Sequence, residues 1–144
     1  MAIYTINGKT YELKLENTSK TIWPKISVDL VAEDGDEINV YYHDCDQYDG
    51  SPENTYVGGG SFYKGNGAER VTPDEAAANE ADYMAEWALD RMTVPEKETG
   101  IWLRNQIEQA AKKLLREAYY DLYSRTFAEY AENRLAEEKE GGEE

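Results

Sequence analysis

Oxygen-bearing side chains are concentrated in residues 44–50, which read DCDQYDG, and Glu53 follows shortly after. Carboxylates gathered on one loop are ligands that Ca²⁺ prefers. The spacing does not match an EF-hand loop, because Tyr48 occupies the position of the third acidic ligand and no glutamate closes a twelve-residue loop. We therefore expect a solvated acidic loop and no metal site, with an adventitious or structural divalent cation as the alternative.

His43 and Cys45 are the only histidine and the only cysteine of the chain. On a strand they would point to the same side, about 7 Å apart. A cysteine nucleophile needs a positive environment, whereas Cys45 lies between Asp44 and Asp46, which disfavour the thiolate. We expect His43 to be a polar surface or strand-end residue and the chain not to be an enzyme. A hydrolase built on carboxylates and a metal is the remaining enzymatic alternative.

Two glycine-containing segments, Gly58-Gly59-Gly60 and Gly65-Asn66-Gly67, raise the question of a phosphate-binding loop. Neither is followed by Gly-Lys-Ser/Thr, and neither has the spacing of a Rossmann fingerprint. The first is expected to be a flexible connection and the second a turn. No cofactor is predicted.

The charge of the chain is strongly negative and unevenly distributed. Thirty Asp and Glu residues against 15 Lys and Arg give a formal charge of −15 in 144 residues. The stretch from residue 33 to residue 53 contains no Lys or Arg, and its acids are Glu33, Asp34, Asp36, Glu37, Asp44, Asp46, Asp49 and Glu53. Phosphate backbones and anionic membranes would be repelled, so direct binding to nucleic acid or to a membrane is not expected. A protein with a basic nucleic-acid-binding groove is the expected partner.

Twelve tyrosines accompany these acids. Tyrosine suits wet interfaces, because it combines a large apolar ring with a hydroxyl group. The residues expected to contact a partner are Asp34, Asp36, Glu37, Tyr41, Asp44, Asp46, Tyr48, Asp49, Glu53 and Tyr56. Glu80 and Glu86 offer an alternative acidic surface. The residues with helical spacing, expected to be core residues or contacts between copies of the chain, are Tyr119, Tyr123, Phe127 and Tyr130.

The first seventy residues have the pattern of antiparallel β-structure. Asn7-Gly8 supplies the positive φ angles of a two-residue hairpin turn between residues 2–6 and 9–16. Alternating apolar residues predict a second hairpin from 26–31 and 38–42 with its turn at 33–36, and a short last strand at 61–64. Pro24 predicts a bulge or a sheet edge at the start of the second hairpin.

At Thr72 the apolar period changes from two residues to 3.6. Thr72-Pro73-Asp74-Glu75 is a capping box with proline at the first helical position, and it predicts a helix from Pro73 to about Met92. A second helix is expected to begin between Glu96 and Ile101, after Pro95, and to reach about Glu138. It would be about 60 Å long if straight. Its apolar face is expected to comprise Leu103, Ile107, Ala111, Leu114, Ala118 and Leu122.

The stretch 101–125 of this second helix is net positive, and it is expected to complement the acidic first helix in an antiparallel pair. Its basic residues are Arg104, Lys112, Lys113, Arg116 and Arg125. Because the second helix is longer than a small β domain is wide, two arrangements remain open. Either it bends near residues 124–126 and folds back, or its distal half meets a second copy or another protein.

The fold class is therefore predicted to be α+β: an antiparallel sheet of two hairpins with four to five strands, followed by two C-terminal helices, the second very long. We expect one domain over residues 1–138, with its β part at 1–70 and its helical part at 71–138, and a disordered acidic tail at 139–144. The sequence contains no apolar run of about 20 residues and no signal region, so a soluble cytoplasmic protein is expected.

In size, composition and clustering of acids among tyrosines, the chain resembles the small acidic DNA-mimic proteins with which phages inhibit restriction or CRISPR nucleases. The resemblance covers overall character and no motif, so it assigns no residues. It implies a non-enzymatic inhibitor that occupies a basic groove in place of nucleic acid. The alternative is a structural or adaptor protein that self-associates, as a homodimer, or docks through its long C-terminal helix.

Overall fold

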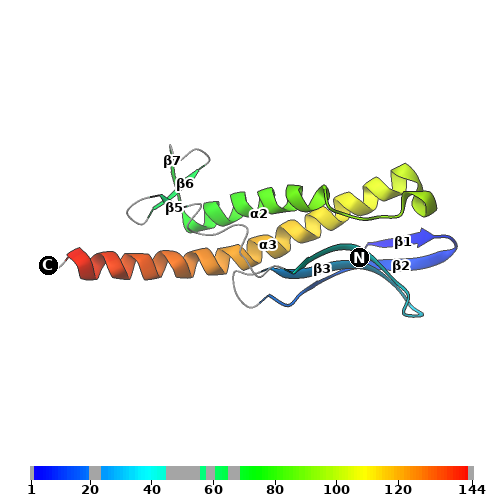
Figure 1. Cartoon of the computed structure of the whole chain (residues 1–144), viewed down its shortest axis with the longest axis horizontal. Helices are drawn as coiled ribbons and strands as arrows, with labels where there is room; N and C mark the ends of the chain where they lie inside the picture. The colour runs from blue at the N-terminus through cyan, green and yellow to red at the C-terminus, as the bar shows by residue number, and fades with distance from the viewer. Residues whose placement is uncertain (1, 20–23, 45–55, 58–60, 65–68, 143–144) are drawn as a thin grey trace.

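The computed structural model describes residues 2–19, 24–44, 56–57, 61–64 and 69–142, with side chains over 2–19, 24–44 and 72–129 and at 132. The strands are β1 (Ile3–Ile6), β2 (Lys9–Asn17), β3 (Lys25–Ala32), β4 (Glu37–Asp44), β5 (Tyr56–Val57), β6 (Ser61–Lys64) and β7 (Glu69–Val71). The helices are α2 (Pro73–Leu89) and α3 (Glu96–Gly142) (Figure 1). The predicted α+β class, an antiparallel sheet followed by two helices of which the second is very long, is confirmed.

Two hairpins form a four-stranded antiparallel sheet in the order β1-β2-β3-β4. Asn7 and Gly8 have φ angles of 51° and 78°, so both residues of the first turn adopt the left-handed conformation that a two-residue hairpin requires. Pro24 directly precedes β3. The bulge lies further along, between Val28 and Asp29, where the register with β4 shifts. Both predicted hairpins are present.

One face of this sheet is buried and the other is bare. The buried face comprises Tyr11 and Leu13 of β2 and the alternate residues Ile26, Val28, Leu30 and Ala32 of β3. Both helices lie on one side of the sheet (Figure 1), and one core cluster joins them to these residues. Among the described residues no helix lies against the opposite side.

Three short strands form a second sheet near the start of α2. They pair in the order β5-β6-β7, and Phe62 of β6 lies opposite Tyr56 on one side and Val71 on the other. From the sequence we expected only the strand at 61–64, as the last strand of the β part. Strands of two to four residues are too short to show a clear alternation of apolar and polar residues.

The two helices are antiparallel and complementary in charge. Glu86 of α2 forms an ion pair with Lys112 of α3, and Asp82 forms one with Arg116. The first helix begins with the predicted cap, because the Glu75 N–H donates to Thr72 Oγ1 over 3.1 Å. The expected pairing of the acidic helix with the basic stretch of the second helix is therefore confirmed.

The second helix does not fold back. α3 is interrupted at Gly100, whose φ of 80° and ψ of 163° are not helical, and from there it continues to Gly142. Ser124 and Thr126 donate their hydroxyl hydrogen bonds to carbonyl oxygens of the preceding turn, so they are accommodated within the helix. Of the two arrangements left open by the sequence, the bend near residues 124–126 is therefore not the one observed. The helix also continues past the predicted boundary at 138, through Lys139 and Glu140, which are good helix formers, to Gly142.

The buried stripe of α3 has a regular four-residue spacing. Its fully buried members are Ile107, Ala111, Leu115, Tyr119, Tyr123 and Phe127. Leu114 and Ala118, which the sequence placed on the buried face, are only partly buried. The observed spacing brings the aromatic rings into stacks, with centroids 5.7 Å apart for Tyr119 and Tyr123 and 5.6 Å apart for Tyr123 and Phe127.

This shift of the stripe can be tested with two neighbouring leucines. Leu115→Ala should lower the free energy of unfolding by about 2–5 kcal/mol, because it leaves a cavity in the core. Leu114→Ala should lower it clearly less, because that side chain is half-exposed. Urea denaturation followed by circular dichroism measures both. Equal losses, or a larger loss for Leu114→Ala, would contradict the observed stripe.

Candidate binding surface

The bare face of the four-stranded sheet is a ladder of polar side chains. The register places these residues in successive rows across β2, β3 and β4: Glu12, Val31 and Glu37; Lys14, Asp29 and Asn39; Glu16, Ser27 and Tyr42; and, across β3 and β4, Lys25 and Asp44. Neighbouring rows are about 7 Å apart, because two residues separate them along each strand. Each of these four rows contains at least one carboxylate, so the acids extend along β2, β3 and β4, whereas the row of Thr5 and Thr10 across β1 and β2 has none.

The structure separates the acids that were predicted to form one patch. Asp34 and Asp36 lie in the turn before β4, Glu37 begins that strand and Asp44 ends it. Glu37 and Asp44 are about 23 Å apart along the strand. The predicted partner-binding residues outside the described residues are Asp46, Tyr48, Asp49 and Glu53, and the side chain of Tyr56 in β5 is also outside them. The described members extend along β4 and do not form a compact cluster.

Four acids that were not among the predicted contacts join this surface. Glu12, Glu16 and Asp29 lie on the bare face, and Glu33 precedes Asp34 in the turn. The described part of β1–β4 holds eight Asp and Glu residues against three lysines, which leaves a charge of −5. Three of these four acids stand apart from the acidic block in sequence. Strand register brings them together, and the alternation along β2 and β3 was the signal that could have placed them.

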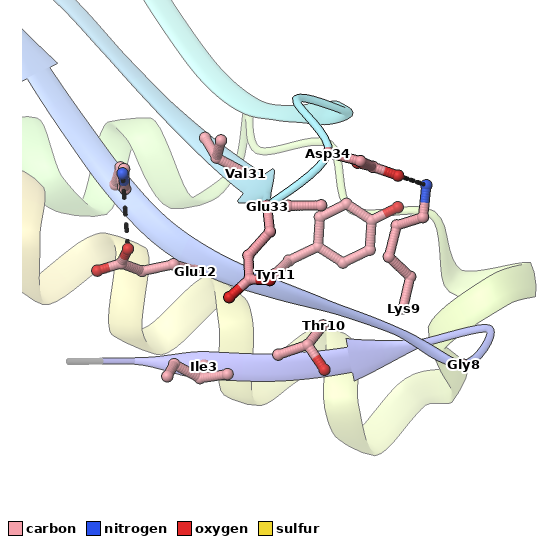
Figure 2. A pocket seen from close by; sticks show the side chains of 11 residues that line it. Ile3, Gly8, Lys9, Thr10, Tyr11, Glu12, Val31, Glu33 and Asp34 are labelled. Atoms are coloured by element: carbon pink, nitrogen blue, oxygen red, sulfur yellow. Dashed lines mark ion pairs between the residues drawn. The ribbon is translucent and has the colours of Figure 1, made fainter.

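The bare face is hollowed near the first hairpin turn. An open hollow of about 700 Å³ is lined by residues of β1, β2 and β3 and of the turns that follow β1 and β3 (Figure 2). Ile3 and Val31 provide aliphatic surface, while Glu12 and Glu33 provide carboxylates. Lysine and arginine side chains have apolar stems and charged ends. The hollow therefore has the chemistry to receive a basic side chain.

Lys9 is shared between two carboxylates at the rim of this hollow. Its Nζ lies 2.7 Å from Asp34 Oδ2 (Figure 2). It also pairs with Asp36. The hydrogen bond from Lys9 holds the pKa of the Asp34 carboxyl below its ordinary value, and the two aspartates raise the pKa of Lys9. The ammonium group of Lys9 is thus shared by two carboxylates.

The two neighbouring tyrosines of β4 have opposite surroundings. Tyr42 is 64% exposed on the bare face, and its hydroxyl donates to Asp44 Oδ2 over 2.9 Å. That hydrogen bond raises the pKa of the Tyr42 hydroxyl. Tyr41 is only 3% exposed and points into the core, so its predicted place in a partner contact is corrected. Tyr42, which was not among the predicted contacts, takes that place on the bare face.

The aromatic residues of α3 belong to the intramolecular core. Tyr119, Tyr123 and Phe127 are fully buried, so the structure favours the core alternative over a contact between copies. The side chain of Tyr130 lies outside the described residues. The hydroxyl oxygen of Tyr119 lies 3.0 Å from that of Tyr41 and 2.9 Å from His43 Nδ1. His43 was expected at the surface or at a strand end; it lies near the end of β4 but is buried.

The alternative acidic surface on α2 is partly neutralised. Glu86 and Asp82 are engaged in ion pairs with α3, and Asp74 accepts a hydrogen bond from Tyr120. Glu80 is partly buried, and desolvation raises the pKa of its carboxyl. The bare face of the sheet is therefore the stronger candidate for an acidic binding surface.

The described part of the chain contains neither a metal-binding cluster nor a membrane-spanning helix. Over these residues no three His, Cys, Asp or Glu side chains gather closely enough to hold a metal ion. Within the same residues, no helix combines the length and the apolar composition needed to cross a bilayer.

The buried hydroxyl of Tyr119 should matter for stability. Tyr119→Phe removes the group that bonds to Tyr41 and His43, and it should lower the free energy of unfolding by about 1–3 kcal/mol. Tyr120→Phe is the matched control, because the neighbouring hydroxyl bonds to the exposed Asp74 and its loss should matter less. Thermal and urea denaturation would measure both variants. No difference between them would contradict a structural role for the buried hydroxyl.

The Lys9 contacts predict a pH effect. The lowered pKa of Asp34 favours the folded state above the ordinary carboxyl pKa, and this contribution is lost as the pH falls through the lowered value. Lys9→Gln should raise the pKa of Asp34 toward its ordinary value, as read by NMR titration of the carboxyl carbon. Lys14→Gln is the control, because Lys14 pairs with Glu12 instead. An unchanged Asp34 titration in Lys9→Gln would refute the assignment.

Comparison of the chain with protein-family models, with curated proteins and with solved structures gave no match.

Proposed function

We propose that this protein is a non-enzymatic acidic binding protein that inhibits a nucleic-acid-binding protein or nuclease by imitating the charge of nucleic acid. This is the anti-CRISPR-like role, of phage or mobile-element origin, that the overall character of the sequence suggested. The supporting observation is the bare face of the sheet, where each of the four rows of side chains across β2, β3 and β4 carries a carboxylate.

The charge of the sheet and of its second hairpin turn fits one nucleic-acid strand better than a duplex. One strand carries a phosphate about every 3.4 Å of helix axis, so the roughly 25 Å length of β4 corresponds to about seven phosphates. The described part of β1–β4 carries eight acids, five on the bare face and three in the turn between β3 and β4, and a net charge of −5. A duplex of that length would carry about twice as many phosphates as a single strand. The proposed target groove is therefore one that contacts a single strand or one strand of a duplex.

Tyr42 adds a feature of nucleic acid other than charge. Its ring is largely exposed in the middle of the acidic ladder, beside Asp44. Proteins that bind single strands stack bases on aromatic side chains and track the backbone with basic ones. An exposed ring among carboxylates offers both kinds of contact to such a groove.

A second function is favoured by the length of α3. Phe127 is the last fully buried member of the stripe among the described side chains, and the helix continues to Gly142, about 22 Å further. This distal part of α3 extends past the end of the four-stranded sheet (Figure 1), which suits it to docking on another protein. The alternative is therefore a structural or adaptor protein that binds through the distal part of α3.

Two matched variants separate these functions. The sheet variant reverses three exposed acids of the bare face, as Glu16→Lys, Glu37→Lys and Asp44→Lys. The helix variant reverses three exposed acids of α3, as Glu117→Lys, Glu129→Lys and Glu132→Lys, and changes the net charge by the same amount. Each protein is immobilised and exposed to a bacterial lysate. Bound proteins are eluted with a salt gradient and identified by mass spectrometry.

We expect the wild type and the helix variant to retain a nucleic-acid-binding protein that elutes early in the gradient and is displaced by a competing oligonucleotide. The sheet variant should bind that protein at least about tenfold more weakly. A partner retained by the sheet variant and lost by the helix variant would support the adaptor function. Recovery of no salt-sensitive partner by the wild type would refute the proposed inhibition.

A further inference from the structure

Over the described residues, no strand pairs with the outer edge of β1. In a two-residue hairpin the residues flanking the turn, Ile6 and Lys9, exchange backbone hydrogen bonds, so alternate residues of β1 face β2. The Leu13 N–H donates to the Ala2 carbonyl over 2.9 Å, which agrees with this alternation. The N–H and C=O groups of Ile3 and Thr5 therefore point away from the sheet, on either side of Tyr4.

An uncharged aromatic surface lies beside this edge. Trp102 of α3 is 74% exposed, the largest exposure of a bulky apolar side chain over the described residues, and Ile3 is 55% exposed. A hollow of about 530 Å³ lies between β1 and one face of α3, and it is lined by Tyr4, Trp102, Asn105, Gln106 and Gln109. None of these side chains is charged, although 31% of the residues in the chain are.

The two edges of the sheet differ in their protection. The β4 edge carries Glu37 and Asp44, contains the bulge, and is contacted where the Thr93 N–H donates to the Val40 carbonyl over 2.8 Å. Charges, bulges and covering segments are the features by which proteins prevent strand addition. The outward positions of β1 have none of them among the described residues, and charge-depleted surfaces with aromatic residues are typical of interface cores.

We propose that a second copy of this chain binds here, with the two β1 strands paired antiparallel about a two-fold axis at Tyr4. This register places Ile3 opposite the partner copy's Thr5, so the four outward N–H and C=O groups of each copy's Ile3 and Thr5 are satisfied. The side chains along the β1 edge and around the hollow are uncharged, so two copies that each carry a charge of −15 can meet there without bringing like charges into contact. The Trp102 face of each α3 lies toward the axis and covers the paired tyrosines.

The same register makes a distance prediction. The paired Tyr4 residues form a non-hydrogen-bonded pair, with Cα atoms about 4.5 Å apart, which is within the range of a disulfide. The two copies of Thr5 are offset by two residues along the strands, so their Cα atoms are about 8 Å apart and cannot be bridged.

Sedimentation of the full chain over a range of concentrations tests the proposal. We expect a monomer–dimer equilibrium that shifts toward the dimer as NaCl rises, because salt screens the repulsion between the copies. Trp102→Lys should raise the dimer dissociation constant at least about tenfold. Tyr83→Lys, which alters another exposed aromatic residue, on α2, should leave it unchanged. A wild-type monomer at all concentrations and salt levels, or equal effects of the two variants, would overturn the proposal.

Cross-linking tests the register without depending on the strength of the dimer. In a Cys45→Ser background, Tyr4→Cys should form a disulfide-linked dimer under mild oxidation, whereas Thr5→Cys should not. Circular dichroism tests whether both variants are folded. If Tyr4→Cys is unfolded, the sedimentation of Trp102→Lys decides whether the proposed dimer exists. Cross-linking of Thr5→Cys alone, or equal cross-linking of both, would overturn the proposed register. Because the bare face is not used, failure here would leave the proposed inhibition intact.

Discussion

The burial of one face of the β-sheet beneath an antiparallel helix pair determines the rest of the structure. α3 contributes the fully buried stripe from Ile107 to Phe127, and α2 contributes mainly alanines, whose small side chains allow close approach of the helices. Each helix has only one apolar stripe, so the pair covers one side of the sheet and leaves the other in water. The acids of the strands must therefore appear on the bare face.

Electrostatic compensation differs between the two parts of the molecule. On the helices, Lys112 and Arg116 pair with Glu86 and Asp82, so the acidic face of α2 is partly neutralised. On the sheet, one lysine is shared by Asp34 and Asp36, and eight acids face only three lysines. Uncompensated repulsion costs stability. The uncompensated acids are confined to a surface that no described helix covers. A binding site for a basic partner requires such an accessible negative surface.

The elements were predictable wherever a local pattern was long enough. Asn7-Gly8 and the Thr72 cap identified the first hairpin and the start of α2, because their chemistry is local. The sequence could not show that a bulge buries Tyr41 and exposes Tyr42 beside it, since only the pairing with β3 reveals the bulge. It also could not choose between Leu114 and Leu115, because both fit a helical period and the stacking of Tyr119 and Tyr123 selects one. The acids of the bare face that lie outside the acidic block were missed because strand register, which brings them together, is a tertiary property.

The two proposed surfaces would be thermodynamically coupled. A two-fold axis perpendicular to the sheet places the bare faces of both copies on the same side of one continuous sheet, so their negative charges repel each other. A basic partner that neutralises one bare face reduces that repulsion and thereby favours pairing of the β1 edges. By linkage, pairing must then strengthen partner binding by the same factor. Added salt changes the two affinities in opposite directions. It lowers the affinity for a basic partner, because it screens their attraction, and it raises the affinity between the two copies, because it screens their repulsion.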